Sequence, residues 1–350
     1  MALSKRTPVI DPLAARPSPP SSILSMRNVR HPTGKSKGKG KAVARKPWAD
    51  GPWPLIETPS RTLNITHPAL HIANELARAH NAALRGLNAL YLQAPSVRQP
   101  GDVADFAFLA RVWSGWVLDH HEVKESGMLP GFEAALGLEV GGLGVVLRGL
   151  VLADGVGDRG RGVIEEEDDE DEDGDGDMRD RGEEGTRDIP TLLQKIHSYA
   201  VEIHSQPTSY SPSILQTLLA SLASVLVPHL HAQIPLLMRM KDLCAPTPSP
   251  SPSNPSPSSP PHLPTPDPAT NLTQIFLAAE TSLANRTDRF AVPPMLIRLR
   301  DAAHDGGAGL SVPAVHAVAD RLSPRHAGAW RFLPCDVWGR RRELEFLGGA

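Results

Sequence analysis

The chain has 350 residues, enough for one or two domains, with Pro 35, Gly 29 and only 5% aromatic residues, which predicts long disordered segments around a modest core. Its two cysteines, Cys244 and Cys335, exclude a disulfide framework and a four-cysteine zinc site, and the net charge of -3 sums strongly opposed regions. We find no apolar signal-peptide segment and no run of membrane-spanning length, so we expect a cytoplasmic protein with no membrane partner.

Residues 1–60 are predicted to form a disordered basic tail, in which Met26 to Lys46 carries eight Lys and Arg residues and no acid. A solvated tail is favoured over a nucleic-acid patch, a nuclear-import signal or a transit peptide, because glycines space the basic residues and no aromatic residues are interleaved with them. Trp48, Trp53 and Leu55 interrupt this polar stretch. We expect them to dock on the folded core as a strap near residues 47–58.

Residues 61–137 are predicted to contain the first two helices of a four-helix bundle. The first helix starts near Thr66, with Pro68 in its first turn, and ends before Pro95. Apolar residues recur along it at helical spacing, and His80 falls in the middle of this apolar stripe. We therefore expect the imidazole of His80 to face the core.

The second predicted helix runs from Asp102, a good N-cap, to Pro130, which should stop it. Its apolar stripe leads into His120 and His121. His121 and Glu125 are four residues apart, so both project from the same side of the helix. A histidine and a carboxylate at this spacing can bind a metal inside a helical bundle. The alternative interpretation is a hydrogen-bonded histidine pair at a helix end.

Residues 138–187 are predicted to be a disordered insertion. Its segment from Glu165 to Asp177 is almost purely acidic, and a run of like charges repels itself and cannot pack. A calcium loop is the sharper alternative, but the segment lacks the spacing of an EF-hand.

Residues 188–243 are predicted to form the third and fourth helices. The third begins near Asp188 and places His197 and His204 on its apolar stripe. The fourth begins at Ser211 and Pro212, an N-cap and first-position pair, and carries His229 and Gln233 on its apolar face. Each of the four helices thus brings at least one histidine to its buried side.

The rest of the chain divides into a linker and a second helical region. About half of residues 244–268 are proline, which predicts an extended linker; a passive linker is favoured over a ligand for SH3 or WW domains. Residues 269–350 are predicted to be a helical and aromatic segment that packs back on the bundle, because it contains Trp330, Phe332 and Trp338.

The buried histidines of the four helices predict a shared metal. They are His80, His120 or His121, His197 and His229. Burying several imidazoles is unfavourable unless each finds a partner, and a metal ion is the simplest partner they can share. Imidazole suits iron, zinc and copper, and imidazole together with a bridging carboxylate suits non-haem iron best.

Four stretches carry a family resemblance: "AHNAALRGLNALYLQAP", "HHEVKESGMLPGFE", "IHSYAVEIHS" and "HLHAQIPLL". In order and spacing they resemble the four helices of fungal hemerythrin-like (HHE cation-binding) domain proteins. The resemblance implies an all-α, up-down four-helix bundle with a carboxylate-bridged di-iron site that binds oxygen, nitric oxide or iron. Carried over by position, the implied ligands are His80, His120 or His121 with Glu125, His197 and His229.

The chain departs from that pattern at two positions. Lys124 and Gln233 stand where the resemblance implies carboxylates. An ammonium and an amide leave less negative charge than two irons need, so we expect one metal, a weak site or none. The leading hypothesis is a non-haem iron protein for binding or sensing, with no turnover chemistry. The alternative is a metal-poor bundle that acts as an interaction scaffold through its disordered arms.

Overall fold

Helices make up all the regular secondary structure of the described residues, apart from one isolated antiparallel bridge between Cys335 and Arg341. The computed structural model describes residues 47–143, 188–244, 268–306 and 310–347. The predicted all-α class is therefore confirmed for these residues. Most of the predicted basic tail (residues 1–60), acidic insertion and proline-rich linker lies outside them.

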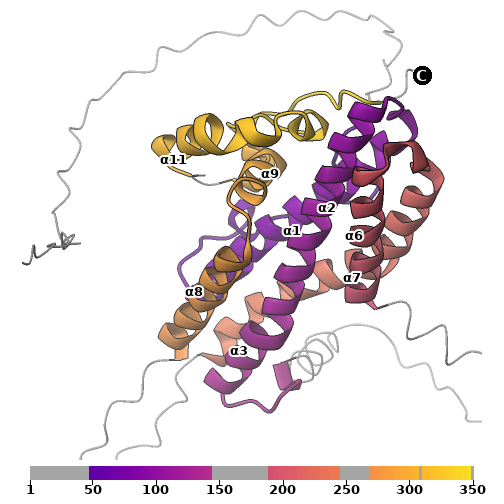
Figure 1. Cartoon of the computed structure of the whole chain (residues 1–350). Helices are drawn as coiled ribbons and strands as arrows, with labels where there is room; N and C mark the ends of the chain where they lie inside the picture. The colour runs from indigo at the N-terminus through magenta and orange to yellow at the C-terminus, as the bar shows by residue number, and fades with distance from the viewer. Residues whose placement is uncertain (1–46, 144–187, 245–267, 307–309, 348–350) are drawn as a thin grey trace, which may run out of the picture. The chain divides into compact units, whose positions relative to one another are not determined.

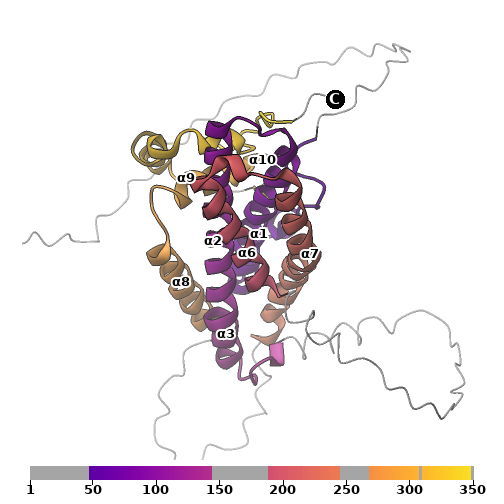
Figure 2. The ribbon, with the colours of Figure 1, turned by 45° about the vertical axis from the view of Figure 1, so that its right-hand side comes forward.

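Four long helices surround the main hydrophobic core: α1 (Pro68–Gln93), α2 (Pro100–Val123), α6 (Ile189–Ser205) and α7 (Pro212–Leu243). Helix α2 packs along α6 and α1 packs along α7, while α6 contacts α7 and α1 contacts α2 (Figures 1 and 2). Their contacts close a ring, and the large side chains inside it are fully buried, among them Leu84, Trp113, Leu193 and Leu222.

Proline marks the first turn of all four helices, at Pro68, Pro100, Pro190 and Pro212. Proline lacks the N–H that has no partner at this position, and its φ angle already suits a helix. The prediction that Asp102 caps α2 is wrong. Helix α2 begins two residues earlier, and the Asp102 carboxylate instead forms a 2.6 Å ion pair with Arg331.

The second helix does not stop at Pro130 as predicted. A π-helical turn (Lys124–Met128) follows α2 directly, and helix α3 (Leu129–Ala135) continues through the proline. A proline ring clashes with the carbonyl group one turn earlier in a regular α-helix, and a wider π-turn relieves this crowding. Of the residues that were predicted to bind metal, Glu125 lies in this π-turn.

Helix α7 is long and apolar enough to cross a membrane by length and composition alone, although no run of spanning length was expected from the sequence. A core helix passes the same test, and α7 packs against both α1 and α6. Pro228 and Pro235 lie inside it.

The C-terminal region adds four helices: α8 (Pro268–Arg286), α9 (Val292–Leu299), α10 (Ala302–Asp305) and α11 (Val312–Ala317). Helix α8 packs on α1, α2 and α3, and α9 packs on α1 and α2 (Figure 1). Trp330 and Phe332 of the C-terminal segment are buried, whereas Trp338 is 42% exposed.

Residues 47–58 lie along α1, where a ladder of buried asparagines holds the strap and the turn after it. Asn88 accepts from the N–H of Trp53, and Asn81 exchanges two hydrogen bonds with the backbone of Ile56. Asn74 accepts from the N–H of Ser60. The asparagines recur every seven residues, so they share one face of α1 and replace the hydrogen bonds that an extended segment lacks.

Candidate metal centre

Two histidines from α1 and α2 meet in the interior of the helices. His80 is fully buried and His120 is 7% exposed, and their ring centroids are 5.7 Å apart in an edge-on arrangement. The Nδ1 atom of His80 lies 3.2 Å from the carbonyl oxygen of Leu230 in α7. The Nε2 atoms of His80 and His120 are buried without a hydrogen-bond partner among the described residues.

A second group lies beside this pair and contains a carboxylate. One ligand atom from each of His121, Glu125 and His229 lies within 4.8 Å of the other two. The Nε2 atom of His229 is 3.2 Å from Oε1 of Glu125, and the rings of His121 and His229 are 5.3 Å apart. Nδ1 of His121 is a third buried imidazole nitrogen without a hydrogen-bond partner in the described part of the chain.

Lys124 and Gln233 are hydrogen-bonded to each other between these two groups. Lys124 is only 2% exposed, and its Nζ donates a 2.6 Å hydrogen bond to Oε1 of Gln233. Nε2 of Gln233 in turn donates to Oε1 of Glu125 at 2.8 Å and lies 3.0 Å from Nε2 of His229. An ammonium offers only donors, so the amide oxygen of Gln233 faces Lys124 and the amide N–H donates to Oε1 of Glu125.

The buried histidines are held neutral. Burial, and then the charge of Lys124, lowers the pKa of His120 to about 3 and that of His121 to about 4. The pKa of His80 falls well below its usual value for the same two reasons. Neutral imidazole is the form that binds a metal.

Lys124 and Glu125 keep opposite charges at neutral pH. Burial lowers the pKa of Lys124 to about 8, against the opposing attraction of Glu125. Burial also raises the pKa of Glu125, but the contact with His229 and the charge of Lys124 outweigh this effect and bring it to about 2. The site therefore combines the buried ammonium of Lys124 and the partly exposed carboxylate of Glu125 with neutral imidazoles.

These donors fit one metal ion and not two. Two imidazoles and one carboxylate are a common ligand set for a non-haem iron(II) ion with open positions, and His121, Glu125 and His229 supply it. Among the described residues, His80 and His120 belong to no ligand group with a carboxylate, and the nearby ammonium of Lys124 repels a second cation.

Two histidines that were placed on the buried stripe lie elsewhere. Nδ1 of His197 is 3.2 Å from the carbonyl oxygen of Arg111, and its ring lies against Gly115, at least one turn before His120 on α2. His204 is exposed and approaches the carbonyl oxygen of Ala104. The structure thus brings together His80, His120, His121, Glu125 and His229, but not His197.

A cysteine nucleophile at Cys335 is not supported. The thiol is fully buried, and burial raises its pKa to about 12. His326, the nearest histidine in the sequence, stacks on the ring of Phe108 at 4.0 Å. A thiol with so high a pKa does not form the thiolate that reacts.

No protein-family model matches the chain, and no solved structure matches it significantly. The chain is similar to the dimeric xanthone biosynthesis cluster protein R11 of Cryptosporiopsis sp. (strain 8999). The two are 22% identical over 313 residues, which cover 87% of this chain and 95% of that protein. The similarity therefore extends over almost the full length of both proteins.

Proposed function

We propose that this protein is a hemerythrin-like metal-binding protein that holds a single non-haem iron at His121, Glu125 and His229. The observation that carries the proposal is the convergence of two imidazoles and a carboxylate beside three buried imidazole nitrogens that have no hydrogen-bond partner in the described structure. An unpaired buried polar atom costs about 1–3 kcal/mol, and an ion at this site removes that penalty for the one unpaired nitrogen that belongs to a ligand, Nδ1 of His121.

The packing of the helices supports an up-down four-helix bundle as the scaffold. Helices α1, α2, α6 and α7 contact one another in a closed ring. A short turn joins α1 to α2, and another joins α6 to α7. The ligands come from α2, the π-turn and α7, so they belong to elements whose positions the core fixes.

In this proposal the protein residues bind and position, and no turnover chemistry is assigned to them. His121, Glu125 and His229 hold the ion, while Gln233 orients Glu125 through a hydrogen bond to its Oε1 atom. Bound iron(II) would supply reversible binding of a small diatomic molecule such as oxygen or nitric oxide. Lys124 limits the site to one cation because its charge lies beside the remaining histidines.

The test is metal titration of the full chain after removal of bound metal with a chelator. Anaerobic calorimetry with iron(II), checked by elemental analysis, should give about one ion per chain. His229→Ala should abolish the binding, and His197→Ala is the matched control because His197 lies outside the group. Absence of binding in the wild-type protein, with its helical circular dichroism intact, would overturn the proposal.

The second candidate is a metal-poor helical scaffold, which the burial of Lys124 favours. Lys124 and Gln233 already pair with each other and with Glu125, so the polar network is partly satisfied without an ion. In this candidate the arms outside the described residues bind protein partners. This candidate predicts that added iron(II) changes the free energy of unfolding of neither the wild type nor His229→Ala. The metal-binding proposal predicts that added iron(II) stabilises the wild type and not His229→Ala.

A further inference from the structure

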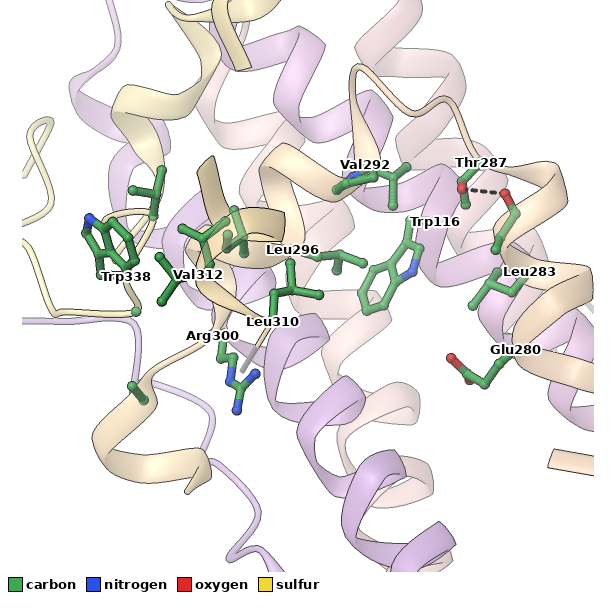
Figure 3. A pocket seen from close by; sticks show the side chains of 17 residues that line it. Trp116, Glu280, Leu283, Thr287, Val292, Leu296, Arg300, Leu310, Val312 and Trp338 are labelled. Carbon is green, nitrogen blue, oxygen red and sulfur yellow. Dashed lines mark hydrogen bonds between the residues drawn. The ribbon is translucent and has the colours of Figure 1, made fainter. Parts of the chain in front are cut away.

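The turn between α8 and α9 separates an apolar cavity from a cationic surface. The cavity, about 520 Å³ in volume, lies between α2, α8, α9 and the C-terminal segment, and Thr287 and Val292 at the two ends of the turn line it (Figure 3). Arg289 and Phe290 lie within the turn and do not belong to the lining of this cavity. The charged side chain of the turn is therefore part of a separate surface.

Three arginines form this separate surface, and each lies over a phenyl ring. The guanidinium carbons of Arg289 and Arg325 are 4.8 and 5.1 Å from the ring centroid of Phe290. The guanidinium carbon of Arg111, on α2, is 5.0 Å from the ring centroid of Phe108. Cation–π attraction to these rings holds the three guanidiniums in place. We call Arg111, Arg289 and Arg325 the arginine surface.

His326 connects the two phenyl rings into one surface. It follows Arg325 directly in the chain, and its ring stacks on Phe108 with the centroids 4.0 Å apart. Burial lowers the pKa of His326, and the charges of Arg325 and Arg111 lower it further. Guanidiniums from two distant parts of the chain therefore act on the same imidazole.

The charge of the arginine surface is largely uncompensated. None of its three guanidiniums forms an ion pair or a hydrogen bond with another described residue. Two carboxylates lie nearby, but Asp105 pairs with Arg331 at 3.5 Å, and Oδ1 of Asp288 accepts from the N–H of Phe290. Three positive charges thus stand against the single charge of Asp288, and the surface attracts an anion with several charges.

The rings beneath the arginines leave little room for nucleic-acid bases. Phe108 and Trp330 are only 5% and 4% exposed, and two guanidiniums lie over Phe290. Proteins that bind single-stranded nucleic acids offer open aromatic faces on which the bases stack. A row of guanidiniums without such faces suits a run of carboxylates, to which arginine binds with two parallel hydrogen bonds.

The chain itself contains a run of carboxylates. Eleven of the 13 residues from Glu165 to Asp177 are acidic, and they lie outside the described residues. Asp177 precedes Asp188 by only a short stretch of chain, which can span at most about 35–40 Å when extended. Helix α6 starts after Asp188 and is about 25 Å long, and near its end His204 lies against Phe108. The acidic run is therefore long enough to reach the arginine surface.

We propose that the arginine surface binds the acidic segment Glu165–Asp177 of the same chain. The bound segment neutralises the surface and excludes other polyanions from it. The proposal goes beyond the metal site and does not depend on it, because none of the proposed metal ligands belongs to the arginine surface.

The experiment is carbodiimide crosslinking of the full chain, which joins an amine to a carboxylate that it touches. Arg325→Lys places an amine on the arginine surface, and mass spectrometry should find position 325 joined to the segment Glu165–Asp177. Arg340→Lys is the matched control, because Arg340 is exposed but lies outside the surface, and its crosslink to the segment should be at least tenfold rarer.

Mixing isotopically labelled and unlabelled protein distinguishes a crosslink within one chain from one between two copies. Circular dichroism checks that each variant keeps its helices. Equal crosslinking from positions 325 and 340, or crosslinks found only between copies, would overturn the proposal.

A binding assay tests whether the surface prefers carboxylates to phosphates. A full-length variant in which the acids of Glu165–Asp177 are changed to Asn and Gln should bind a fluorescent peptide with the wild-type sequence of that segment. Arg289→Ala/Arg325→Ala in this variant should weaken binding at least tenfold, whereas Arg61→Ala/Arg340→Ala, which removes the same charge elsewhere, should not. No binding of the peptide, or tighter binding of a thymidine oligonucleotide of equal charge, would contradict the proposal.

Discussion

Two buried polar clusters on helix α1 differ in how many of their polar atoms have a hydrogen-bond partner. Arg85 and His80 are both fully buried on α1, five residues apart. Both terminal nitrogens of Arg85 bind the Asp305 carboxylate, at 2.7 and 2.8 Å, and only Nε of Arg85 has no partner among the described residues. Around His80, by contrast, three imidazole nitrogens have none.

The difference separates a structural cluster from the cluster that we propose to bind a metal. Asp305 also accepts from Asn81 and from the N–H of Asp301, so its ion pair ties the C-terminal region to α1 and leaves no room for a ligand. Burial raises the pKa of Asp305, yet hydrogen bonds from His304 and Arg85 outweigh it and lower the value to about 2. In the histidine cluster, Nδ1 of His121 is left unpaired, so one proposed ligand atom is available to a metal ion.

The largest effect is expected at the ion pair. Asp305→Ala should lower the free energy of unfolding by about 3–5 kcal/mol, because it leaves the buried charge of Arg85 without its partner. Urea denaturation at pH 7 measures this. Asp320→Ala is the control, because the contact of Asp320 with His316 is exposed. If Asp320→Ala lowered the free energy of unfolding by more than about 1 kcal/mol, burial would not explain the effect at Asp305.

Acid should destabilise the histidine cluster first. The folded-state pKa of His120, about 3, lies below the ordinary value of 6.5, so its contribution to stability is complete above pH 6.5 and is lost as the pH falls below it. Between pH 7.5 and 5 in chelator, His120 should account for about 2 kcal/mol of lost stability. His120→Gln should remove this part of the pH dependence.

The control for this prediction is an exposed histidine. His316→Gln should leave the slope between pH 7.5 and 5 unchanged, because the side chain of His316 is 58% exposed. Asp305 acts in a lower window: its depressed pKa stabilises the fold above pH 3.8, and that stability is lost as the pH falls toward about 2. Equal slopes for His120→Gln and the wild type would contradict the assignment.

Removing the charge of Lys124 should tighten metal binding. Lys124→Met takes away a cation beside the three ligands, so we expect iron(II) to bind about tenfold more tightly, a gain of about 1.4 kcal/mol. Calorimetry measures the affinity. Lys195→Met, on the exposed side of α6, should change nothing, and a weaker site in Lys124→Met would show that Lys124 supports the ligands instead of opposing the ion.

The smallest effect is expected at the surface. Arg286 and Glu122 form a 3.0 Å ion pair in which both side chains are largely exposed. Arg286→Ala should therefore change the free energy of unfolding by less than about 0.5 kcal/mol. Urea denaturation in low and high salt checks this, because a large, salt-insensitive loss would mean that the pair is structural.

Much of the helical framework could be predicted from local patterns. Helix starts near Pro68, Asp188 and Pro212 lie within a residue or two of the predicted positions, because proline fixes its own φ angle and has no N–H to lose. The burial of His80 followed from its place in an apolar stripe. The end of α2 was not predictable in this way, because the π-turn that admits Pro130 depends on its packing against α3 and α8.

The sequence by itself determined the all-α class, the starts of α1, α6 and α7 and the burial of His80, since propensity and periodicity act within a few turns of chain. Only the tertiary structure decided which histidines converge and that Lys124 bonds Gln233, 109 residues away. It also paired Arg85 with Asp305, 220 residues apart, and enclosed the cavity between distant helices. Such contacts depend on how each helix is rotated and docked, and one residue of rotation turns a side chain by about 100°.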